Sequence, residues 1–258
     1  MRRSLATLLL LALLLGCSSS GTKAKTSPED RAHAEDPLYA LTLLRQGSAL
    51  LQQKRSEAAL DKFQEAQRLA PGNATVHNMI GLCHMQMGTL DQAVSSFDQA
   101  LELTPAFTNA RNNRGSAYLR LGKYALAESD FLAVLDDSTY PHRMEAYYNL
   151  GMAELQQGRL AAAEESFHRA AYAPVPVPDA YLRLAEIAEK QGRTDAAIDL
   201  LEEARIKAPE RLEAAVELGR LLLQTGRTAE GRKQLEEVIS ADPGSALADQ
   251  ARSLLASL

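Results

Sequence analysis

Tryptophan is absent from the 258-residue chain, and aromatic residues are few, with five phenylalanines and eight tyrosines. This scarcity argues against a lectin, an aromatic cage or a protein that stacks nucleic-acid bases on aromatic side chains. The 28 lysines and arginines are outnumbered by 33 acidic residues, the net charge is −5, and no basic block interrupts the sequence. The electrostatic footprint of a nucleic-acid-binding protein is therefore missing.

Motifs for catalysis are missing as well. The sequence contains no glycine-rich phosphate loop, no paired-cysteine motif, no Gly-x-Ser-x-Gly and no His-Glu-x-x-His. His77 and His84 lie seven residues apart on one predicted helix but have no acidic ligands nearby, and Cys83 stands alone among apolar residues, as a buried packing cysteine does. We therefore predict a non-enzymatic protein without a cofactor, a metal site or a small-molecule substrate.

The N-terminus carries the only long apolar run. It extends over eleven residues from Leu5 to Leu15, which is too short for the roughly 20 residues of a membrane-spanning helix. Two arginines precede it, and residues 1–16 read as a signal peptide. The end of this segment, Leu-Leu-Gly-Cys at residues 14–17, resembles the bacterial lipobox, in which the cysteine becomes the lipidated N-terminus of the mature protein. The alternative is a plain signal peptide with an incidental cysteine.

The lipobox resemblance implies acyl chains, palmitate included, on Cys17, and Ser18 directly after it implies sorting to the outer membrane. Residues 17–37 comprise this cysteine and a polar stretch without a helical apolar stripe, which we interpret as a flexible tether. With Cys17 acylated, Cys83 is the only free thiol, so an intramolecular disulfide is excluded.

From Ala40 onward the chain repeats itself. One glycine series recurs at steps of 34, 36, 34 and 34 residues between Gly88 and Gly226. Within each period the sequence resembles the tetratricopeptide repeat (TPR), with Leu-Gly, then Ala-x3-Phe and a closing proline; the second repeat has Gly81, Phe97 and Pro105 in these places. The glycine after the first helix provides a left-handed turn, and the proline stops the second helix.

The resemblance implies an all-α TPR superhelix of six helix-turn-helix repeats and a C-terminal capping helix. Neighbouring repeats bury one another's apolar faces, so the whole domain, residues 38–258, shares one continuous core. The repeats are expected at about residues 40–73, 74–107, 108–143, 144–177, 178–211 and 212–244, with the cap at 245–258.

In this fold the first helix of each repeat lines a concave groove. Amide side chains there both donate and accept hydrogen bonds, so they can hold the backbone of a partner segment while leucine and methionine take its side chains. The alternative is that some of these residues only pack between helices or face solvent. The predicted groove residues are Leu44, Asn78, Leu82, Met85, Asn109, Asn112, Asn113, Leu119, Tyr148 and Met152.

The groove positions of the two halves of the chain differ in how many charged residues they hold. The lysines of the carboxylate clamp found in chaperone-binding TPR proteins do not occur at these positions, which disfavours a chaperone adaptor. In repeats five and six the corresponding places hold charged residues, among them Glu189, Glu213 and Arg220, which we interpret as a solvated face.

A lipoprotein signal, a short tether and six TPRs together resemble the pilotin lipoproteins of type IV pilus systems, the PilF/PilW/Tgl family. The junction Asp-Ser-Thr-Tyr-Pro-His-Arg at residues 137–143, followed by Asn149-Leu150-Gly151, is similar to that family's own junction between repeats three and four. The resemblance implies a protein anchored at the outer membrane, with its TPR domain facing the periplasm.

This family resemblance also implies the activity. The protein is expected to bind the secretin of the type IV pilus machine and to promote its localisation, multimer assembly and stability. Pilus formation and twitching or social gliding motility would depend on it. The alternative is a TPR lipoprotein adaptor for outer-membrane β-barrel assembly or for peptidoglycan hydrolases.

Overall fold

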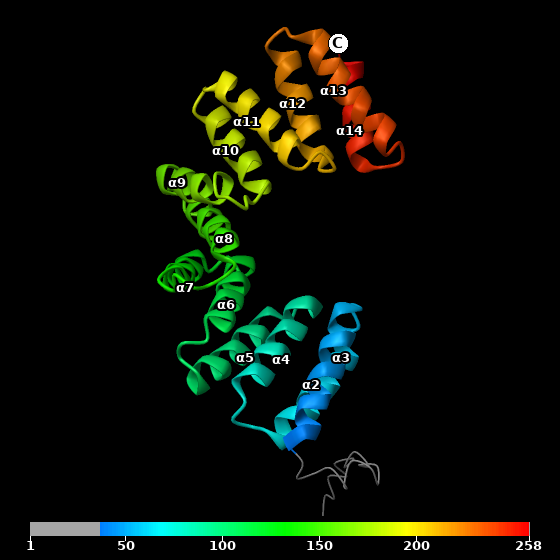
Figure 1. Cartoon of the computed structure of the whole chain (residues 1–258). Helices are drawn as coiled ribbons and strands as arrows, with labels where there is room; N and C mark the ends of the chain where they lie inside the picture. Colours follow the sequence, from blue (N-terminus) through cyan, green and yellow to red (C-terminus); the bar gives the residue numbers. More distant parts are fainter. Residues whose placement is uncertain (1–36, 258) are drawn as a thin grey trace, which may run out of the picture. The chain divides into compact units, whose positions relative to one another are not determined.

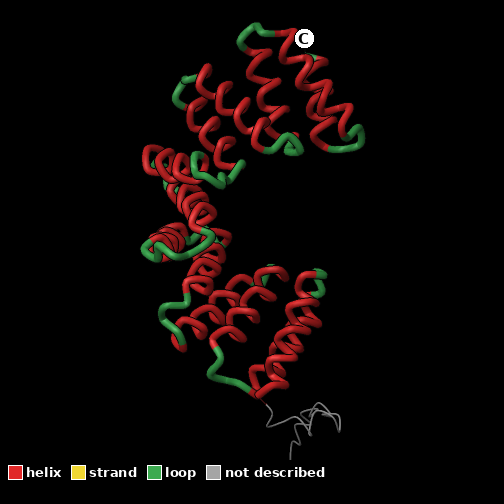
Figure 2. The backbone as a smooth tube through the Cα atoms, viewed as in Figure 1, coloured by secondary structure: helices red, strands yellow, loops and turns green. Residues whose placement is uncertain are grey.

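The computed structural model describes residues 37–257, which form thirteen helices joined by short connections and contain no strand (Figures 1 and 2). The predicted signal peptide, Cys17 and all but the last residue of the predicted tether lie outside this range. The six successive helix pairs are α2 Pro37–Gln52 and α3 Ser56–Leu69, α4 Ala74–Met87 and α5 Leu90–Leu103, α6 Thr108–Arg120 and α7 Tyr124–Leu135, α8 Arg143–Gln156 and α9 Leu160–Ala171, α10 Asp179–Lys190 and α11 Thr194–Lys207, and α12 Leu212–Gln224 and α13 Thr228–Ala241. The chain continues into α14, Ala246–Ala256.

Each helix packs against the next one along the chain, within a pair and between pairs, and α14 packs against both α12 and α13. Each pair contributes small or aromatic side chains to the interior, and buried residues follow one another from Ala40 to Ala251. The predicted all-α fold of six helix-turn-helix repeats with a capping helix is confirmed. None of the described helices is both long and apolar enough to cross a bilayer.

The turn between the two helices of a pair needs a left-handed residue. Gly88 has a φ of 79°, and Gly122, Gly158, Gly192 and Gly226 adopt the same conformation in the following pairs. A residue without Cβ adopts this conformation without a steric penalty. In the first pair the equivalent position, one repeat before Gly88, is occupied by the exposed Lys54, whose φ is 60°.

Replacing Lys54 with glycine is expected to raise the free energy of unfolding by about 1 kcal/mol, because the left-handed conformation strains any residue with a Cβ. Urea unfolding followed by circular dichroism measures this change. Lys54→Ala, which also removes the charged side chain but keeps a Cβ, serves as the control and should bring no comparable gain. Equal stabilisation by both variants would contradict the backbone explanation.

A second set of glycines allows the two helices of a pair to approach closely. A Cβ added to Gly81 in α4 would lie 2.4 Å from Cε1 of Phe97 in α5, and one on Gly47 would lie 2.5 Å from Cε1 of Phe63. Both rings are fully buried. The predicted Gly and Phe signature is therefore one steric unit, in which the missing side chain makes space for the ring.

Candidate partner-binding surface

The first helices of the pairs lie beside one another on one side of the stack. α2 contacts α4, α4 contacts α6, and α6 contacts α8. Two side-chain contacts join α6 to α4: Nδ2 of Asn113 donates to Oδ1 of Asn78 at 2.9 Å, and Nη1 of Arg120 donates to the main-chain oxygen of Met85 at 2.8 Å. We call this side, formed by α2, α4, α6, α8, α10 and α12, the first-helix face.

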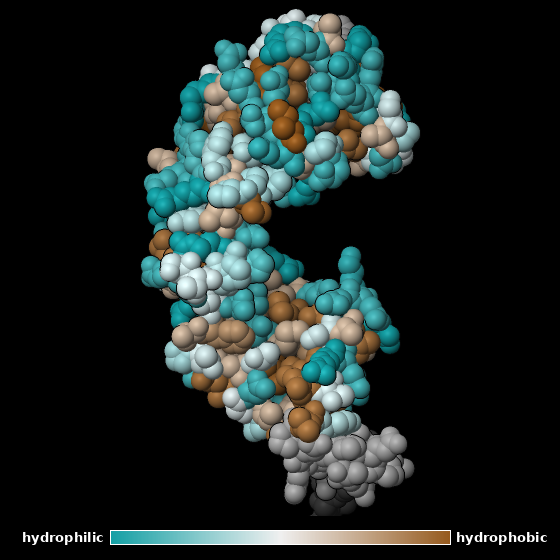
Figure 3. All heavy atoms as spheres, viewed as in Figure 1, coloured by the Kyte–Doolittle hydropathy of each residue, from teal (hydrophilic) through white to brown (hydrophobic). Residues whose placement is uncertain are grey.

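The apolar residues predicted to contact a partner are half-buried on this face. Leu44 packs against the cluster around Phe63, and Leu82 and Met85 pack against the cluster around Phe97. Leu119, Tyr148 and Met152 rest on the clusters of the following pairs in the same way. Each side chain is thus held by the core on one side and keeps part of its surface open, and apolar surface is visible over α2 and α4 in Figure 3.

The four predicted amides have different surroundings. Asn78 is buried, with 6% of its surface exposed, and its side-chain oxygen accepts the hydrogen bond from Asn113. These two amides therefore join α4 to α6. Asn109 is exposed at the beginning of α6. Asn112 is half-buried, and its Oδ1 atom is buried without a hydrogen-bond partner among the described residues.

A buried acceptor such as Asn112 Oδ1 that has no donor destabilises a fold by about 1–3 kcal/mol relative to a satisfied one. Because this atom is itself buried, an N–H group of a bound partner can satisfy it only when the side chains that cover it move aside. Of the predicted amides, Asn112 is thus the one with an unmet acceptor, whereas Asn109 is the one that is exposed.

Sequence reasoning missed a pocket on the C-terminal half of the first-helix face. Its volume is about 440 Å³, and α8, α10 and α12 contribute most of its lining. We call it the charged pocket. It is lined by Tyr148, Asp179, Leu182, Arg183, Ala185, Glu186, Glu189, Leu201, Arg211, Glu213, Glu217, Arg220 and Leu221.

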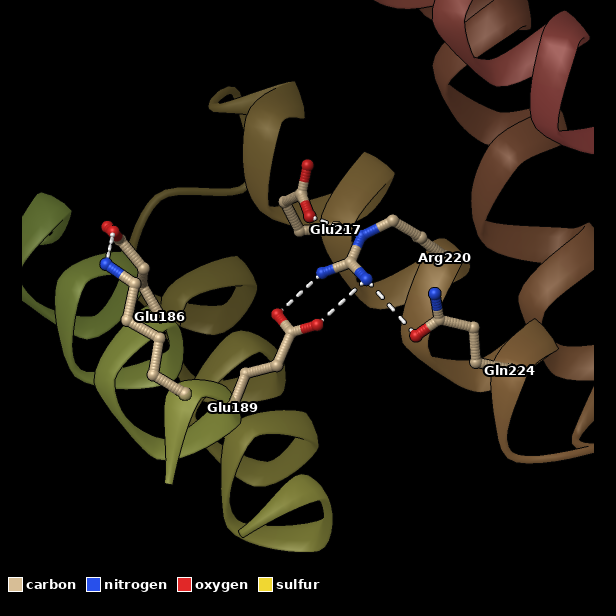
Figure 4. Close-up of polar contacts among 6 residues, drawn as sticks. Glu186, Glu189, Glu217, Arg220 and Gln224 are labelled. Atoms are coloured by element: carbon tan, nitrogen blue, oxygen red, sulfur yellow. Dashed lines mark hydrogen bonds and ion pairs between the residues drawn. The ribbon is translucent and has the colours of Figure 1, made fainter. Parts of the chain in front are cut away.

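Arg220 of α12 holds two carboxylates of the charged pocket in place (Figure 4). Its Nη1 and Nη2 donate to the two carboxylate oxygens of Glu189 in α10 at 3.0 and 2.7 Å, and its Nε donates to Glu217 at 2.8 Å. These hydrogen bonds raise the pKa of Arg220, and the hydrogen bonding to Glu189 has the largest effect. The interpretation of these charges as a plain solvated face is therefore incomplete. The opposite signs of Glu189 and Arg220, on the first helices of neighbouring repeats, were the signal that could have revealed their contact.

The junction between α7 and α8 is a tightly bonded turn. Asp137 accepts hydrogen bonds from the backbone N–H of Thr139 at 3.0 Å and from the hydroxyl of Thr108 at 2.8 Å. Hydrogen bonds lower the pKa of Asp137, and the bond from the Thr139 hydroxyl has the largest effect. Nη1 of Arg143 donates to the main-chain oxygens of Leu135 and Asp137, both at 2.7 Å. Tyr140 is buried beneath this turn. The step from Gly122 to Gly158, which includes this junction, is two residues longer than the other steps of the series. The longer junction thus forms an ordered part of the repeat boundary.

The reactive side chains noted in the sequence are engaged in packing. Cys83 is fully buried, and desolvation raises the pKa of its thiol to about 12, so the nucleophilic thiolate is not populated at neutral pH. His77 is buried and its Nε2 donates to the main-chain oxygen of Pro71 at 3.0 Å, whereas Nδ1 of His84 lies 2.9 Å from the Thr89 hydroxyl. Within residues 37–257 no group of three or more His, Cys, Asp or Glu side chains could hold a metal ion.

Comparison with family models identifies the repeat type. One model of the tetratricopeptide repeat matches residues 30–74, 78–139 and 112–181, and a second model of the same repeat matches residues 188–258. The matches thus include most of the chain and no enzyme family. No curated protein sequence matches the chain.

Solved structures extend the comparison. Pseudomonas aeruginosa PilF superposes with a TM-score of 0.72 at 19% sequence identity, over 86% of this chain and 98% of PilF. PilW, a widely conserved type IV pilus biogenesis factor, has a TM-score of 0.73 at 20% identity, over 81% of this chain and 96% of PilW. A chain of the APC/C hetero-tetramer Cut9–Hcn1 reaches 0.67 at 18% identity, over 88% of this chain but 45% of its own length. At these identities the likeness establishes a shared TPR fold.

Proposed function

This chain belongs to the tetratricopeptide-repeat family, and we propose that it is a non-enzymatic scaffold that binds the secretin of a type IV pilus machine and promotes its assembly into a stable multimer. The proposal includes a lipid anchor on Cys17 and a location at the outer membrane, with the TPR domain facing the periplasm. Pilus formation and pilus-dependent motility would follow from correct secretin assembly.

The observation that carries the proposal is an agreement in length. PilF and PilW align over 98% and 96% of their own chains and over 86% and 81% of this chain, so each match extends over most of both proteins. The Cut9–Hcn1 chain shares the fold but aligns over only 45% of its length. A TPR array is defined by the number of its repeats, because each repeat adds one layer to the binding face. The ordered junction around Asp137 and Arg143 adds local support.

A lipid anchor suits this role. Tethering the first-helix face at a membrane raises its effective concentration for a secretin subunit that arrives at the same membrane. Stable anchoring takes more than one acyl chain, since each buried methylene contributes about 0.8 kcal/mol. The scaffold has no bond to make or break and needs only to bind an assembly-competent subunit more tightly than other states.

Deletion of the gene tests the proposal directly. Outer membranes of the deletion strain are blotted for the heat- and detergent-resistant secretin multimer, with the wild-type gene or a Cys17→Ala version supplied back. We expect the multimer to be lost while secretin monomer remains, the wild type to restore it, and Cys17→Ala to fail. An unchanged multimer in the deletion strain would refute the secretin role, and full rescue by Cys17→Ala would refute the role of the anchor.

Asn112 allows binding to be separated from folding. Substitution with leucine, which has a similar size, removes a buried acceptor that has no partner, so the free energy of unfolding should stay the same or rise by about 1 kcal/mol. When binding moves the covering side chains aside and brings a donor to Oδ1, loss of that hydrogen bond should reduce secretin recovery about 3- to 10-fold. Co-purification of secretin with Asn112→Leu and with the wild type, beside urea unfolding of both, measures the two effects.

The matched control is Gln64→Leu, which replaces an exposed amide on the second helix α3. It should leave secretin recovery at the wild-type level. Equal recovery with Asn112→Leu and the wild type would remove Asn112 from the proposed contact, whichever way the stability changes.

A further inference from the structure

The charged side chains that line the charged pocket favour an occupant of positive charge. The lining includes five carboxylates and three guanidinium groups, an excess of two negative charges. Lys190, which lies outside the lining, pairs with Glu186 at 2.8 Å, so one negative charge remains in excess when this lysine is counted. Each of the three arginines pairs with at least one carboxylate: Arg183 with Glu186, Arg211 with Asp179, and Arg220 with both Glu189 and Glu217. We propose that this pocket receives a basic side chain, lysine or arginine, of a partner protein.

Glu213 is the carboxylate of the charged pocket that is available to pair with an incoming cation. It is exposed in the first turn of α12 and has no hydrogen bond or ion pair among the described residues. The N-terminal end of a helix favours a negative charge, so the fold stabilises this carboxylate where it stands. An incoming ammonium or guanidinium group can pair with Glu213 without breaking any existing contact.

The paired carboxylates also keep capacity for a cation. An ionised carboxylate offers about four lone-pair sites, and Arg220 uses two oxygens of Glu189 and one of Glu217. Arg220 fixes both groups on the wall of the pocket, so their orientation requires no ordering when a ligand enters. A cation here is met by several positioned acceptors.

An anion would meet a different situation. Arg183 and Arg211 each use one Nη atom in their ion pairs, and Nε of Arg183 has no partner among the described residues. An anion that approached them would still lie close to their carboxylate partners, to Glu213 and to the excess negative charge of the lining. Like charges placed together in an interface cost several kcal/mol. The carboxylate end of a peptide is therefore disfavoured as the occupant.

The apolar part of the lining fits the stem of a basic side chain. Leu182 and Leu221 line the pocket together with Tyr148, whose ring contacts Phe167 at a centroid distance of 5.6 Å. Lysine and arginine bury their methylene groups against such surfaces while the charged head reaches polar groups. A polypeptide segment supplies this combination and also extends toward the apolar residues on the first-helix face. The identification of that polypeptide as the secretin rests on the proposed function.

Peptide binding by the purified mature chain tests the inference. The probes are acetyl-Ala-Leu-Lys-Ala-Leu-Lys-Ala-amide and two analogues with glutamine or glutamate in place of both lysines, titrated calorimetrically. The titrations use an ionic strength of about 0.15 M, at which exposed charges more than about 8 Å apart are largely screened. We expect the lysine peptide to bind at least about tenfold more tightly than either analogue.

Two charge reversals provide matched variants. Glu213→Lys changes the pocket, and Asp199→Lys makes the same change of net charge at an exposed residue of α11 that does not line it. We expect Glu213→Lys to weaken lysine-peptide binding about tenfold and Asp199→Lys to change it less than about twofold. Equal affinity of Glu213→Lys and wild type, or equal or tighter binding of the glutamate peptide, would overturn the inference.

Secretin recovery by the same two variants distinguishes this inference from the proposed function. Recovery that falls with Glu213→Lys but not with Asp199→Lys would place the basic residue on the secretin. If the lysine peptide binds through Glu213 but the deletion strain keeps its multimer, the pocket is correct and the secretin role is wrong. If the peptide does not bind while the deletion strain loses its multimer, the secretin role stands and this inference is wrong.

Discussion

Arg114→Met is expected to lower the free energy of unfolding by about 3–5 kcal/mol, because it leaves a buried carboxylate without its partner. Arg114 of α6 donates to both carboxylate oxygens of Asp130 in α7, at 2.8 and 2.7 Å, and to Asp98 of α5 at 2.6 Å. The Asp130 side chain is only 5% exposed. One guanidinium group therefore joins the second helix of pair two to both helices of pair three.

Arg169→Met is the matched control for this prediction. Arg169 also pairs with a carboxylate, that of Glu165, and lies over a tyrosine ring, but its side chain is 54% exposed and that of Glu165 is 68% exposed. Exposed pairs contribute between zero and about 1 kcal/mol, so this variant should remain close to the wild type. Urea unfolding of both variants measures the difference. Similar losses in both variants would contradict the assignment of the Arg114 effect to burial.

The combined variant Arg114→Met and Asp130→Leu provides a further check. Replacing both members of a buried ion pair with apolar residues is often neutral or stabilising, so most of the lost stability should return. Failure of the double variant to recover would mean that Arg114 stabilises the fold through Asp98 or through its contact with Tyr118, 5.7 Å from the ring centroid.

Gly81→Ala is expected to lower the free energy of unfolding by about 1–3 kcal/mol, the usual effect of overpacking a close-packed interior. The added methyl group would lie 2.4 Å from Cε1 of Phe97 and 2.7 Å from Cδ1. The ring is fully buried and α4 and α5 pack tightly against each other, so relief requires the two helices to separate. Gly72→Ala is the control, because a Cβ there meets no atom within 4 Å.

In the fifth pair of this chain, a larger residue in the place of the glycine is combined with a smaller residue in the place of the phenylalanine. Ala185 and Leu201 occupy the positions of the glycine and the phenylalanine, with the same spacing along the chain as Gly81 and Phe97, and both are buried. The double variant Gly81→Ala with Phe97→Leu should therefore be more stable than the sum of the two single changes predicts, by about 1–2 kcal/mol. Strict additivity in a double-mutant cycle would contradict the steric explanation.

The helices and turns were predictable because their signals are local. A left-handed turn requires a residue such as Gly88 or Gly122, and the proline after a second helix stops it, whatever the rest of the chain does. The regular period of the sequence repeats these requirements and so defines the pairs before any contact is known. Lys54 is the exception, because the backbone of the first pair imposes the left-handed turn although the side chain opposes it.

The binding surface was predictable only in part. Position along a helix indicates which face a residue occupies, and the half-buried Leu82, Met85 and Tyr148 lie on the first-helix face. Position along a helix does not indicate whether a polar side chain has a hydrogen-bond partner on a neighbouring helix. Asn78 pairs with Asn113 of the next repeat, whereas the oxygen of Asn112 has no partner among the described residues.

By itself the sequence determined the helical repeats, their number and the close approach within each pair, since each depends on residues within one repeat length. Only the tertiary structure decided how Asn78, Asn112 and Arg114 are used and that five carboxylates and three arginines surround one pocket. The physical reason is the separation along the chain over which each interaction acts. Backbone conformation and steric fit act through residue types at a fixed spacing, whereas pairing of amides and charges depends on short distances between side chains of different helices, several of which belong to different repeats.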